Sequence, residues 1–478
     1  MAKKITVLLL VLILCLSSLT SCFIVTNNEK TDNDNETESD ETPKKQEEFP
    51  PKVDVFGASK KRAEDILEKD FSGIDMNGER FRVVVVEDVD INIQAEQETS
   101  RLKAQSMHTE LVSKKLNCQL QVDTVEYEIF LSDALAAHNA GLFYADLVCV
   151  PQKAIGYMRS RGMLSNLNQL YGDAFNEDYF SADSKMQSAG NNAYYCVAGK
   201  ASVTPSGYAC AYFNKNISDC CGITEKIYSC IGDGSWTLDK MVEFKVECSA
   251  SHGNIIPVVT SDKYTLVNGI FSASGMKYFT TAMDSRPVLA DNGDRFTNLV
   301  TKMQKMLSDQ SIVYAEDSID LFEKEKALFY IGTLEDAPAI KGAYGIMPLP
   351  KLETTQDRYY TYSNENAKVY AVLTTNKQPE HVPNVLRALN ATGELLQVGW
   401  ARDFLDCVLR DAESYNTVRL LFDNVTYDFA YMYGGSYASV ADSSYKALTD
   451  TVFSSADYSN SIKKASAKLT KDIKALYP

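Results

Sequence analysis

The segment Arg80-Phe81-Arg82-Val83-Val84-Val85-Val86 constrains the fold more than any other part of the chain. Its unbroken β-branched run is typical of a strand whose two faces are both covered, because a strand with one solvated face alternates apolar and polar residues. Strands of this kind belong to α/β sheets. The segment therefore predicts a sheet with helices on both sides, in which the ordered part of the chain begins near Gly78.

The residues that follow repeat this pattern. A helix is expected over Thr99 to Asn117, a strand over Cys118 to Tyr127, a helix over Ile129 to Asn139 and a strand over Ala145 to Val150. Parallel β-α-β connections are the simplest interpretation. A second region repeats it with strands at 208–214, 327–332, 344–351 and 369–374, a helix that begins after Thr237, and a helix over 379–393. The pattern predicts two α/β lobes.

Charge and length exclude some classes of function. The chain has 478 residues and a formal net charge of −16, which argues against nucleic acid as a partner, since backbone phosphates need clustered Lys and Arg. One long apolar run lies at the N-terminus, where Lys3 and Lys4 precede an apolar segment from Ile5 to Leu16. This arrangement indicates an export signal.

The export signal ends in Leu19-Thr20-Ser21-Cys22, which resembles the signal of bacterial lipoproteins. The resemblance implies that Cys22 is lipidated and becomes the mature N-terminus, so that the chain is anchored to the membrane without spanning it. Residues 27–50 contain nine acidic residues and three lysines with Phe49 as the one large apolar side chain. Such a segment cannot bury enough surface to fold and is expected to be a disordered stalk.

The order of several short segments resembles the extracellular solute-binding lipoproteins of ABC importers, in the large sugar-binding group that includes maltose-binding protein. The segments are Ala145-Asp146-Leu147-Val148 before Gly156-Tyr157, Tyr212-Phe213-Asn214-Lys215, Trp236-Thr237-Leu238-Asp239, Ala327 to Gly332, Tyr344 to Pro350, and Tyr370 to Leu389. The resemblance implies a two-lobed, periplasmic-binding-protein-like (type II) α/β fold with a ligand cleft between the lobes.

On this sequence the resemblance implies four parts. A lipoprotein signal peptide covers 1–21 and a lipid-anchored acidic stalk covers 22–77. The first lobe comprises 78–209 and 372–428, and the second comprises 210–371 and 429–478. Chain crossings between the lobes are expected near Gly207 to Cys210, Tyr370 to Val372 and Phe429 to Gly435.

Ligands of such folds meet the loops at the carboxyl ends of strands, so the strand predictions nominate the site. The candidates are acids after the valine run, polar residues after the later strands, two residues ahead of the second crossing and aromatic residues at the third crossing. They are Asp88, Asp90 (with Glu87 beside them), Gln152, Lys153, Thr333, Glu335, Tyr362, Asn364, Tyr431 and Tyr433. Each has a structural alternative: the acids as solvated turn residues, and Tyr431 and Tyr433 as core residues.

The sequence contains no recognisable set of catalytic residues. None of the four histidines lies in HExxH, and neither a GxSxG elbow nor a GxxxxGK loop occurs. We therefore expect no catalytic residue, no metal and no cofactor. A carbohydrate-active enzyme, which needs only two carboxylates, and a surface glycan-adhesion protein remain alternatives. The nine cysteines beyond Cys22 and the signal lack a CxxC pair, and Cys220 or Cys221 with Cys230 is a candidate loop-closing disulfide.

These expectations predict a monomeric protein on the extracytoplasmic face of the cell membrane. It would capture a small solute, a mono- or oligosaccharide, and deliver it to an ABC permease. The closed arrangement of the lobes is favoured only as far as the ligand interacts better with it than with the open one.

Overall fold

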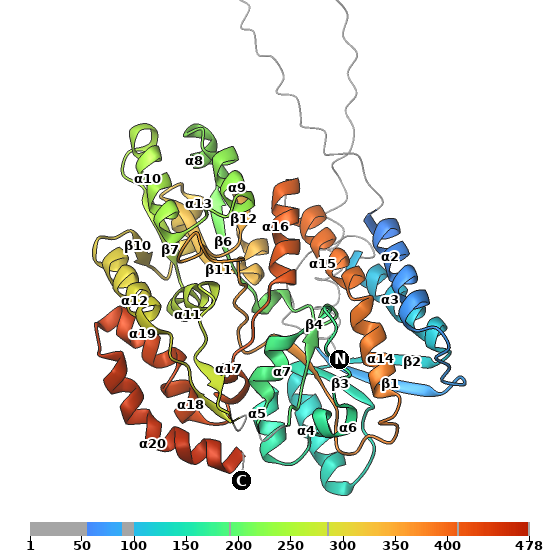
Figure 1. The fold of residues 1–478 in the computed structure, drawn as a ribbon. Helices are drawn as coiled ribbons and strands as arrows, with labels where there is room; N and C mark the ends of the chain where they lie inside the picture. Colours follow the sequence, from blue (N-terminus) through green and yellow to red (C-terminus); the bar gives the residue numbers. More distant parts are fainter. Residues whose placement is uncertain (1–54, 88–99, 191–192, 284–285, 409–410, 477–478) are drawn as a thin grey trace, which may run out of the picture. The chain divides into compact units, whose positions relative to one another are not determined.

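The computed structural model describes residues 55–87, 100–190, 193–283, 286–408 and 411–476. Two larger β-sheets organise this part of the chain, and helices cover them (Figure 1). Within these ranges, none of the helices combines the length and the apolar character needed to cross a bilayer. The predicted signal, Cys22 and the stalk up to residue 54 lie outside the described residues.

The first sheet, sheet A, has four strands in the order β13-β3-β1-β2. The strand β1 (Arg80–Val86) coincides with the predicted valine-rich strand, and its two neighbours β2 (Gln119–Val125) and β3 (Leu147–Pro151) run parallel to it. The edge strand β13 (Lys368–Ala371) is antiparallel to β3. The expected parallel β-α-β connections are confirmed.

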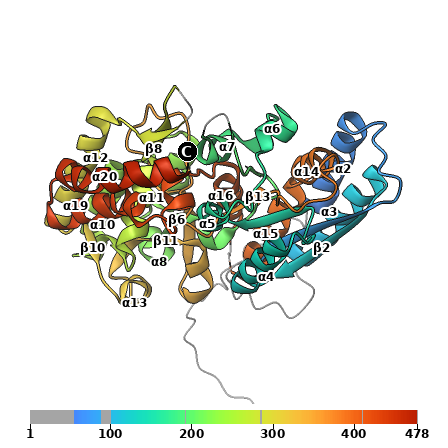
Figure 2. The ribbon, with the colours of Figure 1, turned by 90° about the horizontal axis from the view of Figure 1, so that it is seen from below.

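Helices cover both faces of sheet A, as the valine run predicts. On one face α3 packs against α15, and Phe81, Val83 and Leu386 are fully or almost fully buried there (Figure 2). On the other face Val84 and Phe130 are buried. The elements around the sheet are α2 (Val55–Asp70), α3 (Ser100–Leu116), α4 (Tyr127–Ala140), α5 (Lys153–Ser160), α6 (Leu167–Tyr171), β4 (Phe180–Ser181), α7 (Ala182–Ser188), β5 (Ala198–Gly199), α14 (Val382–Ala391) and α15 (Glu394–Cys407).

The helix α2 corrects one prediction. Residues 55–77 were expected to belong to the disordered stalk, yet α2 packs against α3 and α15. Ala63, Leu67 and Phe71 recur at helical spacing and are buried, so a charged segment still presents one apolar stripe. Arg62 also donates a hydrogen bond from Nη2 to Glu394 Oε1 at 2.7 Å. The prediction is wrong from residue 55 onward because composition conceals this stripe.

The second sheet, sheet F, has five strands in the order β10-β7-β11-β6-β12. Strand β7 is parallel to β10 and β11, whereas β6 is antiparallel to both β11 and β12. The strands are β6 (Ala209–Asn214), β7 (Ile256–Thr260), β10 (Ile312–Tyr314), β11 (Ala327–Thr333) and β12 (Tyr344–Met347). A small antiparallel pair, β8 (Phe279–Thr281) and β9 (Pro287–Leu289), stands apart from the sheet.

The helices on the sheet F side include the predicted one after Thr237. Thr237 Oγ1 accepts a hydrogen bond from Lys240 N at 3.3 Å and caps α10 (Leu238–His252). Trp236 is buried and donates from Nε1 to Pro348 O at 2.8 Å. The other elements are η1 (Pro205–Gly207), α8 (Lys215–Cys220), α9 (Thr224–Gly232), α11 (Lys263–Ala273), α12 (Gly293–Ser308), α13 (Ser318–Glu323), η2 (Leu334–Ala339), α16 (Ala412–Asp423), α17 (Phe429–Tyr433), α18 (Ala438–Asp442), α19 (Tyr445–Ser454) and α20 (Tyr458–Leu476).

The chain passes between the two sheets through segments that lie side by side. Tyr208 forms an antiparallel bridge with Ser363, and Thr361 forms a parallel bridge with Val425. Because β13 pairs with β3 of sheet A, the second crossing precedes Lys368 and lies ahead of the expected Tyr370 to Val372. The lobe boundaries themselves stay a prediction.

The cysteines differ from expectation. Eight of them have side chains that the structure describes, and all eight are free thiols. Cys220 and Cys221 therefore form no bridge to Cys230, which is buried on α9. The expected bridge rested on closeness along the chain, whereas Cys230 is buried in the last turn of α9.

Candidate functional site

The carboxyl end of β3 positions a lysine beside an aromatic ring and an acid. Lys153 is the second residue after the strand and the first of α5, and its Nζ lies 4.9 Å from the centroid of the Tyr127 ring and 3.7 Å from Glu365 Oε1. Two backbone hydrogen bonds hold this arrangement: Gln152 N donates to Ala367 O at 2.7 Å and Lys153 N donates to Glu365 O at 3.1 Å. The end of β3 is thus tied to the segment that crosses between the sheets.

Gln152 and Asn364 position this segment. The Gln152 side chain is fully buried, and its Nε2 donates to Asn364 O at 2.7 Å and to Ser363 Oγ at 3.4 Å. Asn364 N donates to Gly207 O at 2.8 Å, and Asn364 Oδ1 accepts from Asn366 N at 2.9 Å. Both predicted residues therefore hold the backbone that presents Glu365.

Four tyrosines form a continuous group beside that segment on the sheet F side. The Tyr431 ring stacks on Tyr445 at 5.2 Å between centroids and meets the edge of Tyr362 at 5.4 Å. Tyr264 packs edge-on against Tyr445 at 6.5 Å. Tyr362 and Tyr431 are buried, Tyr445 is half-buried and Tyr264 is exposed. The outer two rings thus offer apolar faces that a ligand can cover.

Glu365 connects the two sides electrostatically. Burial raises the pKa of Tyr127 to about 12, with smaller contributions from Glu128 and Glu365, and burial raises the pKa of Tyr445 to about 12, again with a contribution from Glu365. Both hydroxyls are therefore neutral at physiological pH and can donate as well as accept a hydrogen bond. Burial also raises the pKa of Tyr362, and nearby Asp262 adds to the effect.

We name these residues the strand-end site. It consists of Tyr127, Lys153, Asp262, Tyr264, Glu365 and Tyr445. Asp262 follows β7, caps α11 by accepting hydrogen bonds from Tyr264 N at 2.8 Å and Thr265 N at 3.1 Å, and remains exposed. The site therefore combines half-buried aromatic rings, carboxylates and one ammonium group at the carboxyl ends of strands from both sheets.

The predicted pair Thr333 and Glu335 lies at the end of β11, next to this site. Thr333 N donates to Asp336 Oδ2 at 2.8 Å, and Thr333 O accepts from the Tyr212 hydroxyl at 2.6 Å. Burial raises the pKa of Asp336, and the carboxylate of Asp262 contributes to the shift. Thr333 thus caps η2, while Glu335 is exposed in its first turn.

The remaining predicted residues fall outside the strand-end site. Tyr433 is fully buried and stacks on Phe429 at 4.3 Å, so it belongs to the core. It presses on Gly156 of α5, where an added Cβ would lie 3.1 Å from Tyr433 Cα. Asp88, Asp90 and the lipidation residue Cys22 lie outside the described residues.

Of the six members of the strand-end site, only Lys153 was predicted from the sequence. The other five are Tyr127, Asp262, Tyr264, Glu365 and Tyr445. The run from Ile256 to Thr260 is rich in β-branched residues, so the same rule applied to β7 would have nominated Asp262. Tyr264 follows in the next turn. Glu365 is one residue beyond the predicted Asn364. Tyr445 begins α19 and has no local signal, because its position depends on how the C-terminal helices pack.

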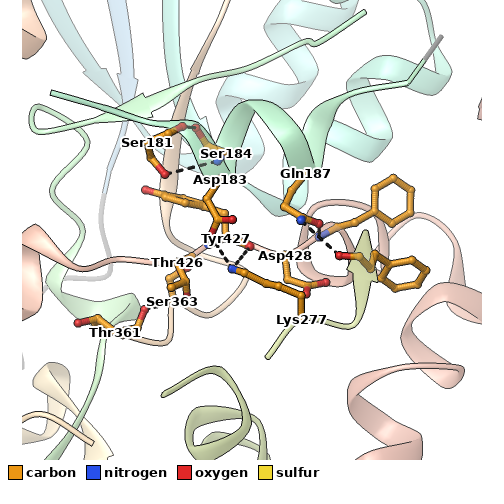
Figure 3. Close-up of polar contacts among 12 residues, drawn as sticks. Ser181, Asp183, Ser184, Gln187, Lys277, Thr361, Ser363, Thr426, Tyr427 and Asp428 are labelled. Atoms are coloured by element: carbon orange, nitrogen blue, oxygen red, sulfur yellow. Dashed lines mark hydrogen bonds and ion pairs between the residues drawn. The ribbon is translucent and has the colours of Figure 1, made fainter. Parts of the chain in front are cut away.

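A second concentration of polar groups lies where α7 meets the segments before β8 and α17 (Figure 3). Lys277 Nζ donates to Asp183 Oδ2 at 2.5 Å and to Tyr427 O at 2.6 Å, while Gln187 Oε1 accepts from Phe429 N at 2.9 Å. Asp428 accepts from Tyr278 N at 2.8 Å and Ala430 N at 2.9 Å. We name Asp183, Gln187, Lys277, Tyr427 and Asp428 the polar cluster.

The polar cluster is mostly buried. Asp428 is fully buried, and burial raises its pKa to about 6 even though Lys277 and two backbone N–H groups favour the charged form. A cavity of about 620 Å³ lies beside the cluster, and its lining includes Asp183, Lys277, Arg358 and Tyr360. The hydrogen bonds of the cluster join α7, beside sheet A, to the segments before β8 and α17. The cluster therefore ties elements around the two sheets together.

Comparisons with known proteins identify the fold of the chain. No protein-family profile and no curated protein sequence matches the chain. Solved structures do match. The galacto-N-biose-/lacto-N-biose I-binding protein of the ABC transporter from Bifidobacterium longum, in complex with lacto-N-biose, has 14% sequence identity and a TM-score of 0.50, covering 84% of this chain and 98% of its own. The chain has the two-lobed fold of the periplasmic solute-binding proteins.

Two further sugar-binding proteins of this fold match over a similar length. A cyclo/maltodextrin-binding protein complexed with maltotetraose has 16% identity and a TM-score of 0.51, covering 83% of this chain and 98% of its own. The cyclic α-maltosyl-1,6-maltose binding protein from Arthrobacter globiformis has 11% identity and a TM-score of 0.52, covering 83% and 99%. The predicted two-lobed α/β fold is confirmed. At these identities the likeness concerns the fold, so the ligand must be argued from the site.

Proposed function

We propose that the protein is a solute-binding lipoprotein of an ABC importer that captures a mono- or oligosaccharide at the strand-end site. The observation that carries the proposal is the composition of this site at the carboxyl ends of strands from both sheets. Aromatic faces of Tyr264 and Tyr445 lie near the carboxylates of Asp262 and Glu365. A sugar offers the matching surface, with apolar ring faces and a belt of hydroxyl groups.

The energetics of such a site are sufficient. Micromolar capture requires about −8 kcal/mol. Each net hydrogen bond contributes about 1 kcal/mol, hydrogen bonds to charged groups about 1.5–3 kcal/mol, and covered apolar area about 25 cal/mol per Å². Two carboxylates, one ammonium group and two partly exposed rings can reach this value. Lobe closure is then favoured by the contacts that the sugar makes with both sides.

The N-terminal sequence supports membrane anchoring as a further part of the proposal. Leu19-Thr20-Ser21-Cys22 would be processed so that Cys22 carries acyl chains, and the acidic segment 27–50 would serve as a spacer. The protein would then work as a monomer on the extracytoplasmic face and pass its sugar to a permease. Replacing Cys22 by Ser should abolish labelling by palmitate and release the protein from the membrane fraction. Continued labelling of that variant would exclude lipidation at Cys22.

Calorimetric titration tests the binding proposal. Wild-type protein should bind one class of mono- or oligosaccharide with micromolar affinity, and Tyr264→Ala should weaken binding at least tenfold because it removes a stacking face. Tyr360→Ala is the matched control, since this tyrosine lines the cavity beside the polar cluster. Equal losses for both variants would contradict the assignment of the site.

Two results would favour the alternative functions. Release of shorter products from a glycan incubated with the protein would indicate a carbohydrate-active enzyme. Retention on an insoluble glycan, without binding of any short sugar, would indicate an adhesion protein. Either result would replace the importer proposal.

A further inference from the structure

Three thiols lie where α8 meets α10. Helix α8 ends at Cys220, Cys221 follows as its C-terminal cap, and Cys248 lies on α10, which packs against α8. Cys220 is exposed, Cys221 is half-buried and Cys248 is fully buried. The Cys221 thiol points at Cys248, since its Sγ lies 4.0 Å from Cys248 O, although the two residues are 27 positions apart.

The electrostatics of Cys248 agree with this contact. Burial is the main cause that raises the pKa of Cys248, and a hydrogen bond with the Cys221 thiol is the next. Cys220 contributes least to this shift. Of the two neighbouring cysteines, Cys221 therefore has the larger effect on Cys248, in agreement with the contact between Cys221 Sγ and Cys248 O.

Cys230 lies elsewhere. It is on α9, where its carbonyl oxygen accepts from Trp236 N at 3.0 Å and from the Tyr359 hydroxyl at 2.9 Å. Among ionisable neighbours its thiol acts on Lys240, whose pKa it helps to raise after the larger effect of Glu243. The described ranges contain no group of three His, Cys, Asp or Glu side chains placed to hold a metal ion.

We propose that Cys221 and Cys248 are a redox pair that closes to a disulfide when the protein meets a low-molecular-weight disulfide. The Cys221 thiolate attacks one sulfur of the oxidant, whose S–S bond breaks and releases one thiolate. The Cys248 thiolate then attacks Cys221 Sγ and displaces the second thiolate. Two protein thiols are oxidised, one disulfide is reduced to two thiols, and the protons of the cysteines pass to the released thiolates.

The disulfide would link the end of α8 to α10 on the sheet F side of the molecule. It would close a loop that contains α9 and most of α10, which constrains the unfolded chain and raises the thermal midpoint by about 2–5 °C. Because the reacting form of Cys248 is the thiolate and burial disfavours it, closure should speed up as pH rises from 7 to 9. The inference does not depend on the sugar proposal.

Peptide mapping tests the pair, because trypsin separates the candidate cysteines. Peptide 216–226 contains Cys220 and Cys221, peptide 227–240 contains Cys230, and peptide 246–263 contains Cys248. After treatment with oxidised glutathione at pH 8.5 and acid quenching, we expect 216–226 linked to 246–263 and the loss of two free thiols. A link to 227–240, or glutathione attached to Cys220 as the sole product, would overturn the proposal.

Single substitutions identify the partner within peptide 216–226. Cys220→Ser should leave the link intact, whereas Cys221→Ser should abolish it. Cys248→Ser should leave Cys221 as a mixed disulfide with glutathione, and Cys230→Ser serves as the control that leaves the link unchanged. Cys248→Ala replaces Cys248→Ser if the buried hydroxyl prevents folding. Persistence of the link in Cys221→Ser would contradict the assignment.

Discussion

The strand-end site and the polar cluster are both rich in charged and polar groups, and both join elements of the two sheets. They differ in how far their polar groups are exposed. In the polar cluster, Lys277 and Asp428 bond to side chains and backbone groups of the protein itself. In the strand-end site, Asp262, Tyr264 and Glu365 are exposed. The comparison teaches that a high density of polar groups can serve packing alone, so the proposed binding site rests on exposed polar groups beside partly exposed rings.

The largest expected effect on stability comes from a substitution that disrupts the polar cluster. Replacing Lys277 by Ala leaves Asp183 without its cation and Tyr427 O without a donor, and the side chains of this pair are only about one-fifth exposed. We expect the free energy of unfolding in urea to fall by about 2–4 kcal/mol. Lys324→Ala is the control, because the pair Lys324–Asp320 is largely exposed and solvent screens it, so its loss should leave the stability almost unchanged. Equal losses for both variants would show that the cluster has no special role.

The pH dependence of unfolding sharpens the same contrast. The pKa of Asp428 is raised by burial to about 6, so the folded state holds this proton more tightly than the unfolded state. Its contribution to stability is therefore present at low pH and lost as pH rises from about 4 to 6, by up to about 2–3 kcal/mol. Asp428→Asn should make the stability rise more steeply with pH across this window in urea titrations.

His108 provides the opposite sign in the same range. Burial lowers its pKa to about 4, and its ring Nε2 hydrogen-bonds Leu389 O at 2.8 Å. Because the unfolded state binds a proton first, stability is lost as pH falls from about 6.5 to 4. His108→Asn should remove this loss. If neither variant changes the slope, the assignments of Asp428 and His108 as titrating groups are wrong.

A smaller effect is expected at the contact between α5 and α17. An added Cβ on Gly156 would lie 3.0 Å from Met432 O and 3.1 Å from Tyr433, both on the buried side of α17. Gly156→Ala should cost about 1–2 kcal/mol of unfolding free energy, because backbone and a buried ring must move. Gly232→Ala is the control, since its Cβ would meet open space. A stabilised Gly156→Ala variant would contradict the packing described.

The smallest expected change in stability belongs to the strand-end site. Lys153 is paired with Glu365 at 3.7 Å, and both side chains are partly exposed. Lys153→Met should change the free energy of unfolding by less than about 1 kcal/mol, yet weaken sugar binding about tenfold. Calorimetry and urea unfolding on the same preparation separate the two effects. A variant that binds normally would remove Lys153 from the site.

Local pattern predicted much of the fold. The strand β1 and the start of α10 match their predicted residues because a β-branched run and a threonine cap act over a few neighbours. The helix α2 was missed since its stripe of Ala63, Leu67 and Phe71 lies among charges. The strand β7 was not predicted, although most residues from Ile256 to Thr260 are β-branched.

The site was predictable only where strands ended. Lys153 follows from the rule that loops at the carboxyl ends of strands bind ligands, and Asn364, next to Glu365, was predicted because it lies ahead of the second crossing. Tyr445 comes from a helix more than 290 residues beyond Lys153, so its place depends on tertiary packing that no short pattern records. The same limit applies to the thiols: closeness along the chain favoured Cys230 as a partner for Cys221, whereas helix packing places Cys248 there.

Hydrogen exchange with and without the bound sugar tests the central claim most directly. The account predicts that backbone amides around residues 126–128, 152–157, 261–266 and 364–366 and the start of α19 become protected together when the sugar binds. Protection confined to residues 176–183 and 357–360, which line the cavity beside the polar cluster, would contradict it.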